Sequence, residues 1–343
     1  MKKSLIIIIT VFTVFSCKNN SKTESSTSEK SEIKEQVKFP SDVIPFMDKW
    51  KILLGDGTKS EDLVGFQKAD FFYVESDEDT DWVVYKTPNS GVTSRTSSNT
   101  RTELGEKKHW VPEEGGKLTG TLKVMHVSTT GNADVSSSYS VVVGQIHSDE
   151  GHENEPLKIF YKKFPVHKKG SVFWNYEINT EGDNSGRWDY STAVWGYDFS
   201  VVGTSPTSYP EEPEDGITLN ETFSYEVNVY KGMMYLTFTS DGHCAKKFTK
   251  NLLKSDFEKK SDIPQQVLKL YAAKGRDGVE RDTAYAGELQ YFKQGAYNQA
   301  NGKTTKSETY GGDIAKQYAN GSYAEVWFKD ATLGSGSPPI NEE

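Results

Sequence analysis

The chain has 343 residues, of which 35% are hydrophobic and 12% aromatic, and its formal net charge is −9. This length accommodates one large β domain or two small ones, and it is long enough to bury a sizeable core. The acidic balance argues against nucleic acid as a partner. An anionic ligand would need a locally basic site, because the overall field of the molecule repels it.

The N-terminal residues 1–17 have the pattern of a lipoprotein signal peptide. Two lysines begin the segment, and the apolar stretch Leu5 to Phe15 is too short to span a bilayer. The run Val14 to Cys17 resembles a bacterial lipobox, in which Cys17 becomes the lipidated first residue of the mature protein. We therefore expect an exported bacterial lipoprotein, anchored to a membrane at the cell surface or in the periplasm. The alternative is an ordinary cleaved signal peptide with a stray cysteine.

Residues 18–38 contain no aromatic residue and cannot bury enough surface to offset the entropy of ordering, which predicts a disordered tether. Folded structure is expected from Phe39. The apolar pattern from Ile44 to Trp50 predicts a brief helix, and the segment Ile263 to Lys274, which precedes Gly275, predicts a second one.

Most of the remaining chain consists of short runs with a period of two, separated by turn-forming residues. We expect strands at Trp82–Lys86, Arg101–Leu104, Leu118–Thr129, Ser138–His147, Lys158–Lys163, Ser171–Asn179, Thr222–Tyr230, Met233–Thr239, Glu288–Tyr297 and Tyr323–Lys329. Many strands with few helices between them predict an all-β fold, a β-sandwich jelly roll of two antiparallel sheets with a few short helices. We predict one such domain, spanning residues 39–335.

Three of these segments carry residues suited to chemistry. In the first, strict alternation places Val141, Val143, Gln145 and His147 on one face. An amide donor beside an imidazole suits a site that binds a carboxylate and removes a nearby proton. A histidine in a strand is nevertheless more often structural.

The second segment places Arg101 and Glu103 on one face, where they form an ordinary salt bridge or, at a binding site, a carboxylate-binding guanidinium oriented by the acid. The third segment aligns Lys293, Gly295 and Tyr297. It is either a tyrosine-rich strand with a solvated lysine or a site in which Lys293 lowers the pKa of the phenol and Gly295 lets a sugar ring approach the backbone.

Together the motifs RTEL (101–104), QIH (145–147) and YFKQGAYNQ (291–299) resemble the three signature strands of alginate lyases of the seventh polysaccharide lyase family. The similarity extends over roughly residues 40–330. The chain departs from the family pattern at Gly105, where an arginine is usual, and this change removes one substrate or structural contact.

The resemblance implies cleavage of alginate by β-elimination. Arg101 and Gln145, with Asn298 as a further candidate, would neutralise the uronate carboxylate, and Glu103 and Lys293 would help to bind the substrate. His147 and Tyr297 would act as base and acid on guluronate, whereas Tyr297 alone could serve both roles on mannuronate. The Ile of the QIH motif resembles members that favour guluronate-containing chains.

The resemblance implies no metal or other cofactor, and we read the acidic run Asp77, Asp79 and Asp81 as a solvated loop because it lacks the glycine and the bidentate glutamate of a calcium loop. We expect a monomer that binds alginate and a membrane. Two other functions stay open: a non-catalytic, lectin-like polyuronate-binding module, and a lyase for another polyuronate such as glucuronan. A glycoside hydrolase would need a second acid opposite Glu103.

Overall fold

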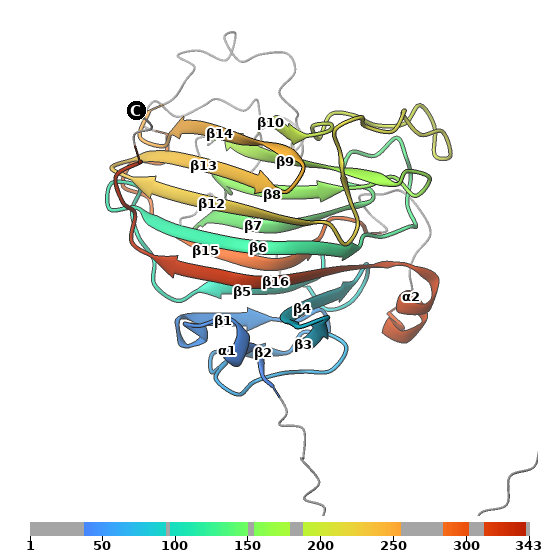
Figure 1. Ribbon diagram of the computed structural model, residues 1–343, viewed down its shortest axis with the longest axis horizontal. Coiled ribbons are helices and arrows are strands. Elements are labelled where there is room, and N and C mark those ends of the chain that lie inside the picture. Colours follow the sequence, from blue (N-terminus) through green and yellow to red (C-terminus); the bar gives the residue numbers. More distant parts are fainter. Residues whose placement is uncertain are drawn as a thin grey trace, which may run out of the picture. The chain divides into compact units, whose positions relative to one another are not determined.

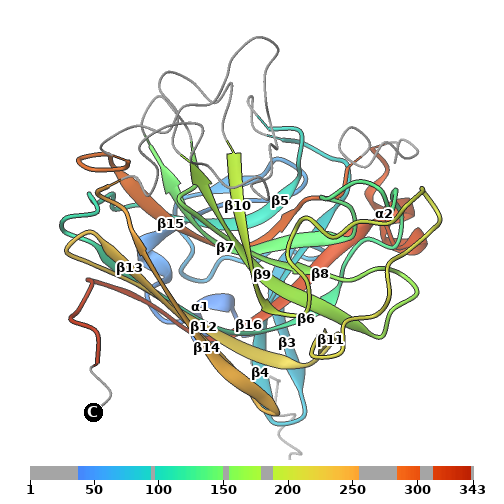
Figure 2. The same cartoon turned by 90° about the horizontal axis from the view of Figure 1, so that it is seen from above.

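The computed structural model describes residues 38–93, 97–149, 154–178, 188–254, 284–301 and 312–340 (Figure 1). The strands of this part of the chain form two antiparallel sheets that pack face to face (Figure 2). The predicted all-β sandwich is therefore confirmed. Lys38 and the residues that follow belong to one compact unit.

The first sheet has nine strands in the order β10-β9-β8-β7-β15-β5-β1-β2, with β11 paired to β9. Its strands are β1 (Trp50–Leu53), β2 (Lys59–Ser60), β5 (Arg101–Glu106), β7 (Ser140–Ser148), β8 (Leu157–Lys162), β9 (Lys169–Ile178), β10 (Trp188–Trp195), β11 (Ile217–Thr218) and β15 (Gln290–Asn298). The three strands that carry the signature motifs, β7, β15 and β5, are adjacent at its centre.

The second sheet has seven strands in the order β14-β13-β12-β6-β16-β4-β3. They are β3 (Phe72–Asp77), β4 (Thr80–Pro88), β6 (Gly116–His126), β12 (Thr222–Tyr230), β13 (Met233–Ser240), β14 (His243–Asn251) and β16 (Tyr323–Gly334). This sheet covers the inner face of the first sheet and leaves the opposite face of the first sheet for function.

The core between the sheets is built from aliphatic and aromatic side chains. Leu104, Ile146 and Phe292 of the nine-stranded sheet are fully buried there. From the other sheet, the rings of Tyr85 and Phe328 meet edge to face, with their centroids 5.5 Å apart. Each fully buried side chain of this kind contributes about 1.5–3 kcal/mol.

The helices differ in position from the prediction. The chain forms α1 at Pro40–Val43, where the side chain of Asp42 accepts a hydrogen bond from the Phe39 amide at 2.8 Å. One 3₁₀ turn follows at Met47–Lys49, and Trp50 already begins β1. The predicted helix at 44–50 was therefore wrong for most of its length, because proline starts a helix well and the buried Trp50 is needed in the sheet.

A further short helix, α2 (Ile314–Asn320), was not predicted. It begins at Asp313, whose carboxylate accepts from the Lys316 amide at 3.0 Å, and it ends at Gly321, where φ is 83°. The predicted helix at 263–274 lies outside the described residues. Within the described part of the chain, no helix is long and apolar enough to cross a membrane.

Two irregularities in the central strands change which residues share a face. The register between β7 and β8 shifts between Val142 and Gly144, and that between β15 and β7 shifts between Gln294 and Tyr297. As a result Val141 and Val143 point into the core, whereas Val142 packs against Tyr297 on the other face. Gln145 and His147 share a face as predicted, but the prediction that Val141 and Val143 lie on the same face was wrong, because a β-bulge resets the face of the strand before Gln145.

Candidate active site

The residues predicted for catalysis lie on the face of the nine-stranded sheet that points away from the second sheet. The strand register pairs Arg101 with Tyr297 across β5 and β15, and it pairs Gln145 with Lys293 across β7 and β15. These four residues are all buried. Together with Glu103 and His147 they form what we call the polar cluster.

Glu103 lies at the centre of the polar cluster, with 3% of its surface exposed. One carboxylate oxygen accepts from Lys293 Nζ at 2.8 Å and from Arg101 at 3.2 Å. The other oxygen accepts from the side-chain amide of Gln145. The acid thereby holds three donors together on one face of the sheet.

The charges of the polar cluster shift one another's pKa values. Burial tends to raise the pKa of Glu103, but the Lys293 ammonium and the Arg101 guanidinium outweigh it and hold the pKa below its ordinary value. Burial, and then the positive charge of Arg101, lower the pKa of Lys293 to about 8. Glu103 is therefore a charged anchor, unsuited to donate a proton at neutral pH, and the polar cluster carries one net positive charge there.

The Tyr297 hydroxyl sits beside the guanidinium. The central carbon of Arg101 lies 3.8 Å from the centre of the Tyr297 ring. Ser97 Oγ is 3.2 Å from both the Tyr297 hydroxyl and Arg101 Nη2. Sequence reasoning missed Ser97, which belongs to a serine- and threonine-rich stretch with nothing to distinguish one hydroxyl from the next.

His147 is held by contacts on three sides. Its Nδ1 lies 2.6 Å from the carbonyl oxygen of Ser148, which requires a proton on Nδ1 and leaves the lone pair on Nε2. Its ring stacks on Tyr291 with the centroids 5.2 Å apart. Nε2 is 3.6 Å from a carboxylate oxygen of Glu155.

Burial lowers the pKa of His147 to about 4, against the opposing effect of Glu155. The imidazole is therefore neutral at physiological pH and able to accept a proton. The histidine predicted beside Gln145 can therefore accept a proton, although its pKa lies below the ordinary value on which that prediction relied.

Two buried polar atoms in the polar cluster have no hydrogen-bond partner among the described residues: Gln145 Oε1 and Arg101 Nε. Buried groups of this kind are uncommon in native structures, and each costs about 1–3 kcal/mol when unpaired. Their presence together on the face that bears Tyr297 is typical of a site that a polar ligand completes.

Asn298, which the sequence predicted as a substrate-binding residue, is hydrogen-bonded within the fold. The side-chain amide of Asn298 donates to Asn89 Oδ1 at 2.7 Å, and its oxygen accepts from the Ala300 amide at 3.0 Å. Asn298 is fully buried by these contacts, and we leave it out of the polar cluster.

Gly295 has a structural reason to be glycine. Its φ is 142°, and an added Cβ would lie 2.6 Å from the Thr102 carbonyl oxygen and 2.9 Å from Tyr85, which belongs to the opposite sheet. The small residue is therefore required by close packing, and approach of a sugar is not needed to explain it.

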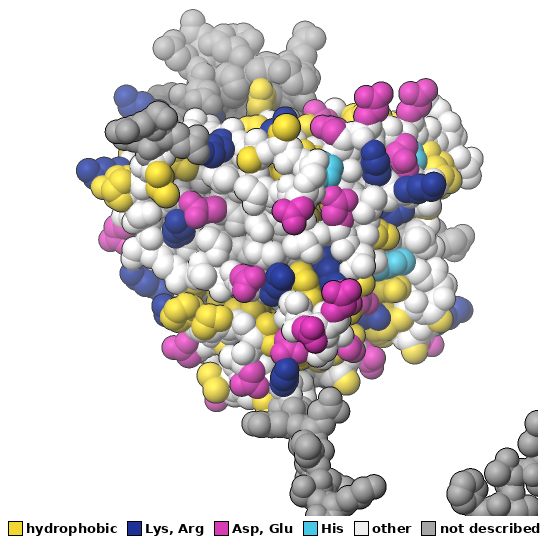
Figure 3. Space-filling model, viewed as in Figure 1, with side chains coloured by type: hydrophobic (Ala, Val, Ile, Leu, Met, Phe, Trp, Pro, Cys, Tyr) yellow, Lys and Arg dark blue, Asp and Glu magenta, His cyan; other side chains and the backbone are white. Residues whose placement is uncertain are grey.

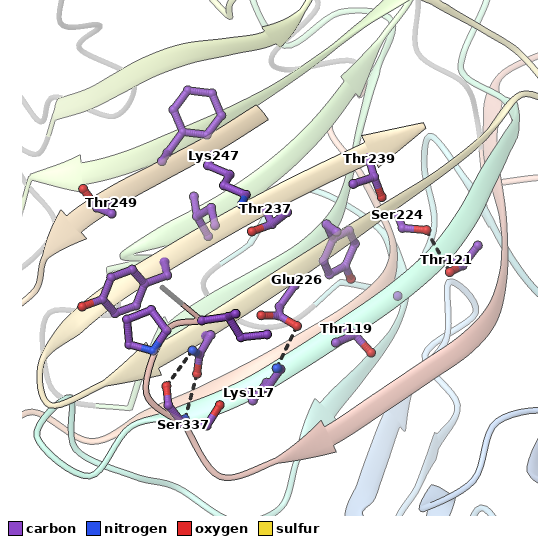
Figure 4. Close-up of a pocket in the computed structure, with 18 of the residues that line it drawn as sticks. Lys117, Thr119, Thr121, Ser224, Glu226, Thr237, Thr239, Lys247, Thr249 and Ser337 are labelled. Atoms are coloured by element: carbon purple, nitrogen blue, oxygen red, sulfur yellow. Dashed lines mark hydrogen bonds and ion pairs between the residues drawn. The ribbon is translucent and has the colours of Figure 1, made fainter. Parts of the chain in front are cut away.

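A concave region lies on the outer face of the seven-stranded sheet, a groove of about 620 Å³ lined by β6, β12, β13, β14 and the segment 337–340 (Figure 4). Hydroxyl-bearing residues and the ion pair Lys117–Glu226 line it, whereas its described lining includes neither histidine nor arginine. Acidic and basic side chains are scattered over this face, between backbone and side chains that are neither hydrophobic nor charged (Figure 3). The groove lacks the base and the guanidinium of the polar cluster, which is the better candidate for chemistry.

A β-sandwich whose sheet face carries a neutral imidazole, a phenol and a guanidinium is the framework of a polysaccharide lyase. A family model described as alginate lyase matches residues 44–335, and the chain belongs to this family. An alginate lyase of Klebsiella pneumoniae is 29% identical over 281 residues, which cover 72% of this chain and 76% of that protein.

Solved structures agree. The exolytic alginate lyase AlyA5 of Zobellia galactanivorans, from polysaccharide lyase family 7, is 74% identical, with a TM-score of 0.84, and the match covers 88% of this chain and 99% of that one. The structure of the Klebsiella pneumoniae alginate lyase has a TM-score of 0.62 at 23% identity, with the same coverage, and supports the fold.

Proposed function

We propose that this chain is an alginate lyase that cleaves 4-linked uronate chains by β-elimination and leaves an unsaturated uronate at the new end. The observation that carries the proposal is the convergence of Arg101, Gln145, His147 and Tyr297 on one face of three adjacent strands. Family membership and the 74% identical alginate lyase support the same substrate class.

The first requirement of the reaction is to make the proton at C5 acidic. While the neighbouring carboxylate keeps its full charge, loss of this proton is unfavourable. Arg101, whose Nε has no partner among the described residues, and the side-chain amide of Gln145 bind the carboxylate and stabilise the negative charge that moves onto it in the enolate-like intermediate. Lys293 adds positive charge, and Glu103 holds all three donors in place.

The second requirement is a base and an acid. The Nε2 lone pair of His147 takes the C5 proton, the C4–O4 bond breaks as the C4–C5 double bond forms, and the Tyr297 hydroxyl gives its proton to O4. Solvent then takes the extra proton from His147 and returns one to Tyr297. In guluronate the proton and the leaving oxygen lie on opposite faces of the ring, which suits two separate groups.

We extend the proposal to a preference for guluronate-containing regions, which the Ile146 form of the QIH motif and the separate base and acid support. The test is to mix the purified protein with polyguluronate, polymannuronate and glucuronan separately and to follow the ultraviolet absorbance of the unsaturated product. Fastest release from polyguluronate is expected. Equal rates on both alginate blocks would remove the preference, and product from glucuronan alone would move the activity to another polyuronate.

A flat trace with all three polymers, despite measurable binding, would favour the lectin-like alternative. A hydrolase is disfavoured on structural grounds, because Glu103 is charged and occupied by three donors. Hydrolysis would also leave no unsaturated product, so reducing ends released without ultraviolet absorbance would identify it.

Cleavage from chain ends is the mode that the 74% identical structure supports, since it is described as exolytic. If this chain shares that mode, alginate viscosity will fall slowly relative to the release of unsaturated product, and monomers or very short products will appear from the start. A rapid loss of viscosity at low conversion would show internal cleavage instead.

Export as a lipoprotein anchored through Cys17 completes the proposal, and the lipobox-like sequence before Cys17 supports it. Radiolabelled palmitate should be incorporated into the expressed chain, and the labelled chain should be found in the membrane fraction. The label should be absent from Cys17→Ser. An unmodified chain that incorporates no palmitate and is found only in the soluble fraction would support an ordinary signal peptide, and incorporation that persists in Cys17→Ser would place the lipid on another residue.

A further inference from the structure

Glu155 lies two residues before β8 begins, and its side chain approaches His147. One of its carboxylate oxygens lies 3.6 Å from His147 Nε2, and the other lies 3.2 Å from Lys158 Nζ. Its side chain is 9% exposed. No sequence motif distinguished this acid from its neighbours in the stretch SDEGHENE.

The position of the Glu155 carboxylate is fixed by its neighbours. Lys158 also forms an ion pair with Glu177, which is fully buried on the adjacent strand β9. The amide of Glu155 donates to a Glu177 carboxylate oxygen at 2.8 Å, and the amide of Glu177 donates to the Glu155 carbonyl oxygen at 3.3 Å. Backbone and side chain thus place a charged oxygen beside the imidazole.

The position of the Glu155 carboxylate is important because His147 is the tautomer that carries its proton on Nδ1. Nδ1 of His147 donates to the Ser148 carbonyl oxygen at 2.6 Å, so a proton taken from substrate arrives on Nε2. The new N–H is then next to the Glu155 oxygen. A carboxylate near a forming imidazolium stabilises it, and the effect is strong where water is largely excluded.

Other charged groups act on His147 as well. Burial lowers its pKa most, Glu155 opposes that shift, and the positive charges of Lys293 and Arg101 reinforce it. Among the described residues, the titratable or charged groups around the imidazole include Arg101 and Glu103 on β5, Tyr291 and Lys293 on β15, and Glu155 and Lys158 at or just before β8. Of these, Glu155 is the acid whose oxygen is within 4 Å of Nε2.

We propose that Glu155 is a positioning residue for His147, whose carboxylate orients the imidazole and stabilises the proton that Nε2 accepts. The proposal rests on the proposed function, because it assigns His147 as the base. It adds a third group to the base and acid pair, and one that does not touch the substrate itself.

The test is Glu155→Gln, which keeps the size of the side chain and removes its charge. We expect kcat on alginate to fall roughly tenfold, a part of the full effect of a general base, with KM unchanged. In the same variant the pKa of His147, measured by NMR titration of labelled histidine, should fall because the opposing carboxylate is gone. The His147 signal is assigned among the six histidines with His147→Gln.

A matched control is available in Glu221→Gln. Glu221 pairs with His243, with Nε2 and Oε1 2.7 Å apart, at a histidine outside the polar cluster. This variant removes an equivalent carboxylate from another histidine, so it should leave both kcat on alginate and the titration of His147 unchanged. Loss of activity in the control would show that the effect at Glu155 is not specific.

Each outcome decides the proposal. A titration of His147 that is the same in Glu155→Gln and the unmodified protein would overturn it, whatever the activity. If the unmodified protein shows no lyase activity, the proposed function fails, while the titration still measures the coupling of the two residues. If Glu155→Gln does not fold, Glu155→Asp retains the charge for Lys158 but withdraws the oxygen from Nε2, and a fall in the pKa of His147 is again expected.

Discussion

At the scale of single residues, Glu103 explains why the polar cluster can exist in a buried place. An isolated carboxylate there would be protonated, and an isolated lysine would lose its proton. Two cations and one anion in contact keep both cations available at neutral pH, and Glu103 positions Gln145 as well. The same arrangement sets the limits of pH within which the site can work.

The first prediction concerns those limits. His147 must be deprotonated to act as a base, so activity is lost as the pH falls through its pKa of about 4, a value set by burial. Lys293 must be protonated to contribute its charge, so activity is lost as the pH rises through its pKa of about 8, a value set by burial and by Arg101. The profile of kcat/KM against pH should therefore have two limbs.

Lys293→Arg identifies the alkaline limb. Arginine stays charged throughout the accessible range, so the limb near pH 8 should move upward while the acid limb stays in place. An alkaline limb that is the same in this variant would assign it to another group.

The second prediction concerns Gly105, where the family has an arginine. An added Cβ would meet Lys51 at 3.6 Å and Tyr291 at 3.8 Å, which are ordinary contacts. Gly105→Arg should therefore fold normally and lower KM for alginate by about fivefold, equivalent to about 1 kcal/mol for one ion pair with the substrate. Gly105→Gln is the uncharged control, and an equal change in KM there would attribute the effect to shape.

At the scale of elements, the order and pairing of the central strands bring the three motifs together, and the bulges determine which side chains reach the site. Val142 and Tyr297 face the same side only because the register of β7 and β15 shifts near them. The shift at β15 requires a residue of unusual conformation, and Gly295 provides it at a φ of 142°.

The third prediction follows from that requirement. Gly295→Ala would bring Cβ within 2.6 Å of the Thr102 carbonyl oxygen, in a backbone conformation that side chains rarely adopt. We expect the free energy of unfolding to fall by about 3 kcal/mol, measured by urea denaturation. Gly334→Ala is the control, because nothing lies within 4 Å of its added Cβ. A loss below about 0.5 kcal/mol at Gly295 would mean that the bulge can rearrange.

The sequence predicted the strands best where alternation was long and bounded by turns, as at β12, whose bounds Thr222 to Tyr230 match the prediction. It did not reveal β14 or β10, because their side chains do not alternate clearly between apolar and polar. Bulges cannot be found by alternation, since their cause is contact with a partner strand.

For the site as well, the sequence predicted some residues and missed others. The prediction of Arg101, Gln145, His147 and Tyr297 rests on the resemblance of their motifs to a known family, and the strand pairing brings the four residues together on one sheet. Ser97 and Glu155 were missed because their roles depend on distances to residues far away in the sequence. His109 likewise has no partner at a recognisable spacing, yet it pairs with Asp149 at 2.8 Å and stacks on Tyr291.

At the scale of the whole molecule, two sheets share one core, and only one outer face carries the polar cluster. The chain has a net charge of −9, whereas the polar cluster has one net positive charge. The net negative charge of the chain therefore repels a polyanionic substrate, whereas the polar cluster attracts it locally. This contrast leads to the fourth prediction.

Raising the ionic strength from very low to physiological values should increase kcat/KM on alginate, because long-range repulsion is screened over a Debye length of about 8 Å at that salt concentration while contacts inside the buried cluster are screened much less. The value of kcat should stay constant. A steady fall in kcat/KM with added salt would show that local attraction governs association.

The central claim is that His147 and Tyr297 act as base and acid on one sheet face. Its most direct test is the initial rate of unsaturated product formation from alginate by the unmodified protein, His147→Ala and Tyr297→Phe, with binding of alginate measured in parallel. The account predicts that each variant binds but loses activity by roughly a hundredfold or more. Variants that retain rates within a few-fold of the unmodified protein would contradict it.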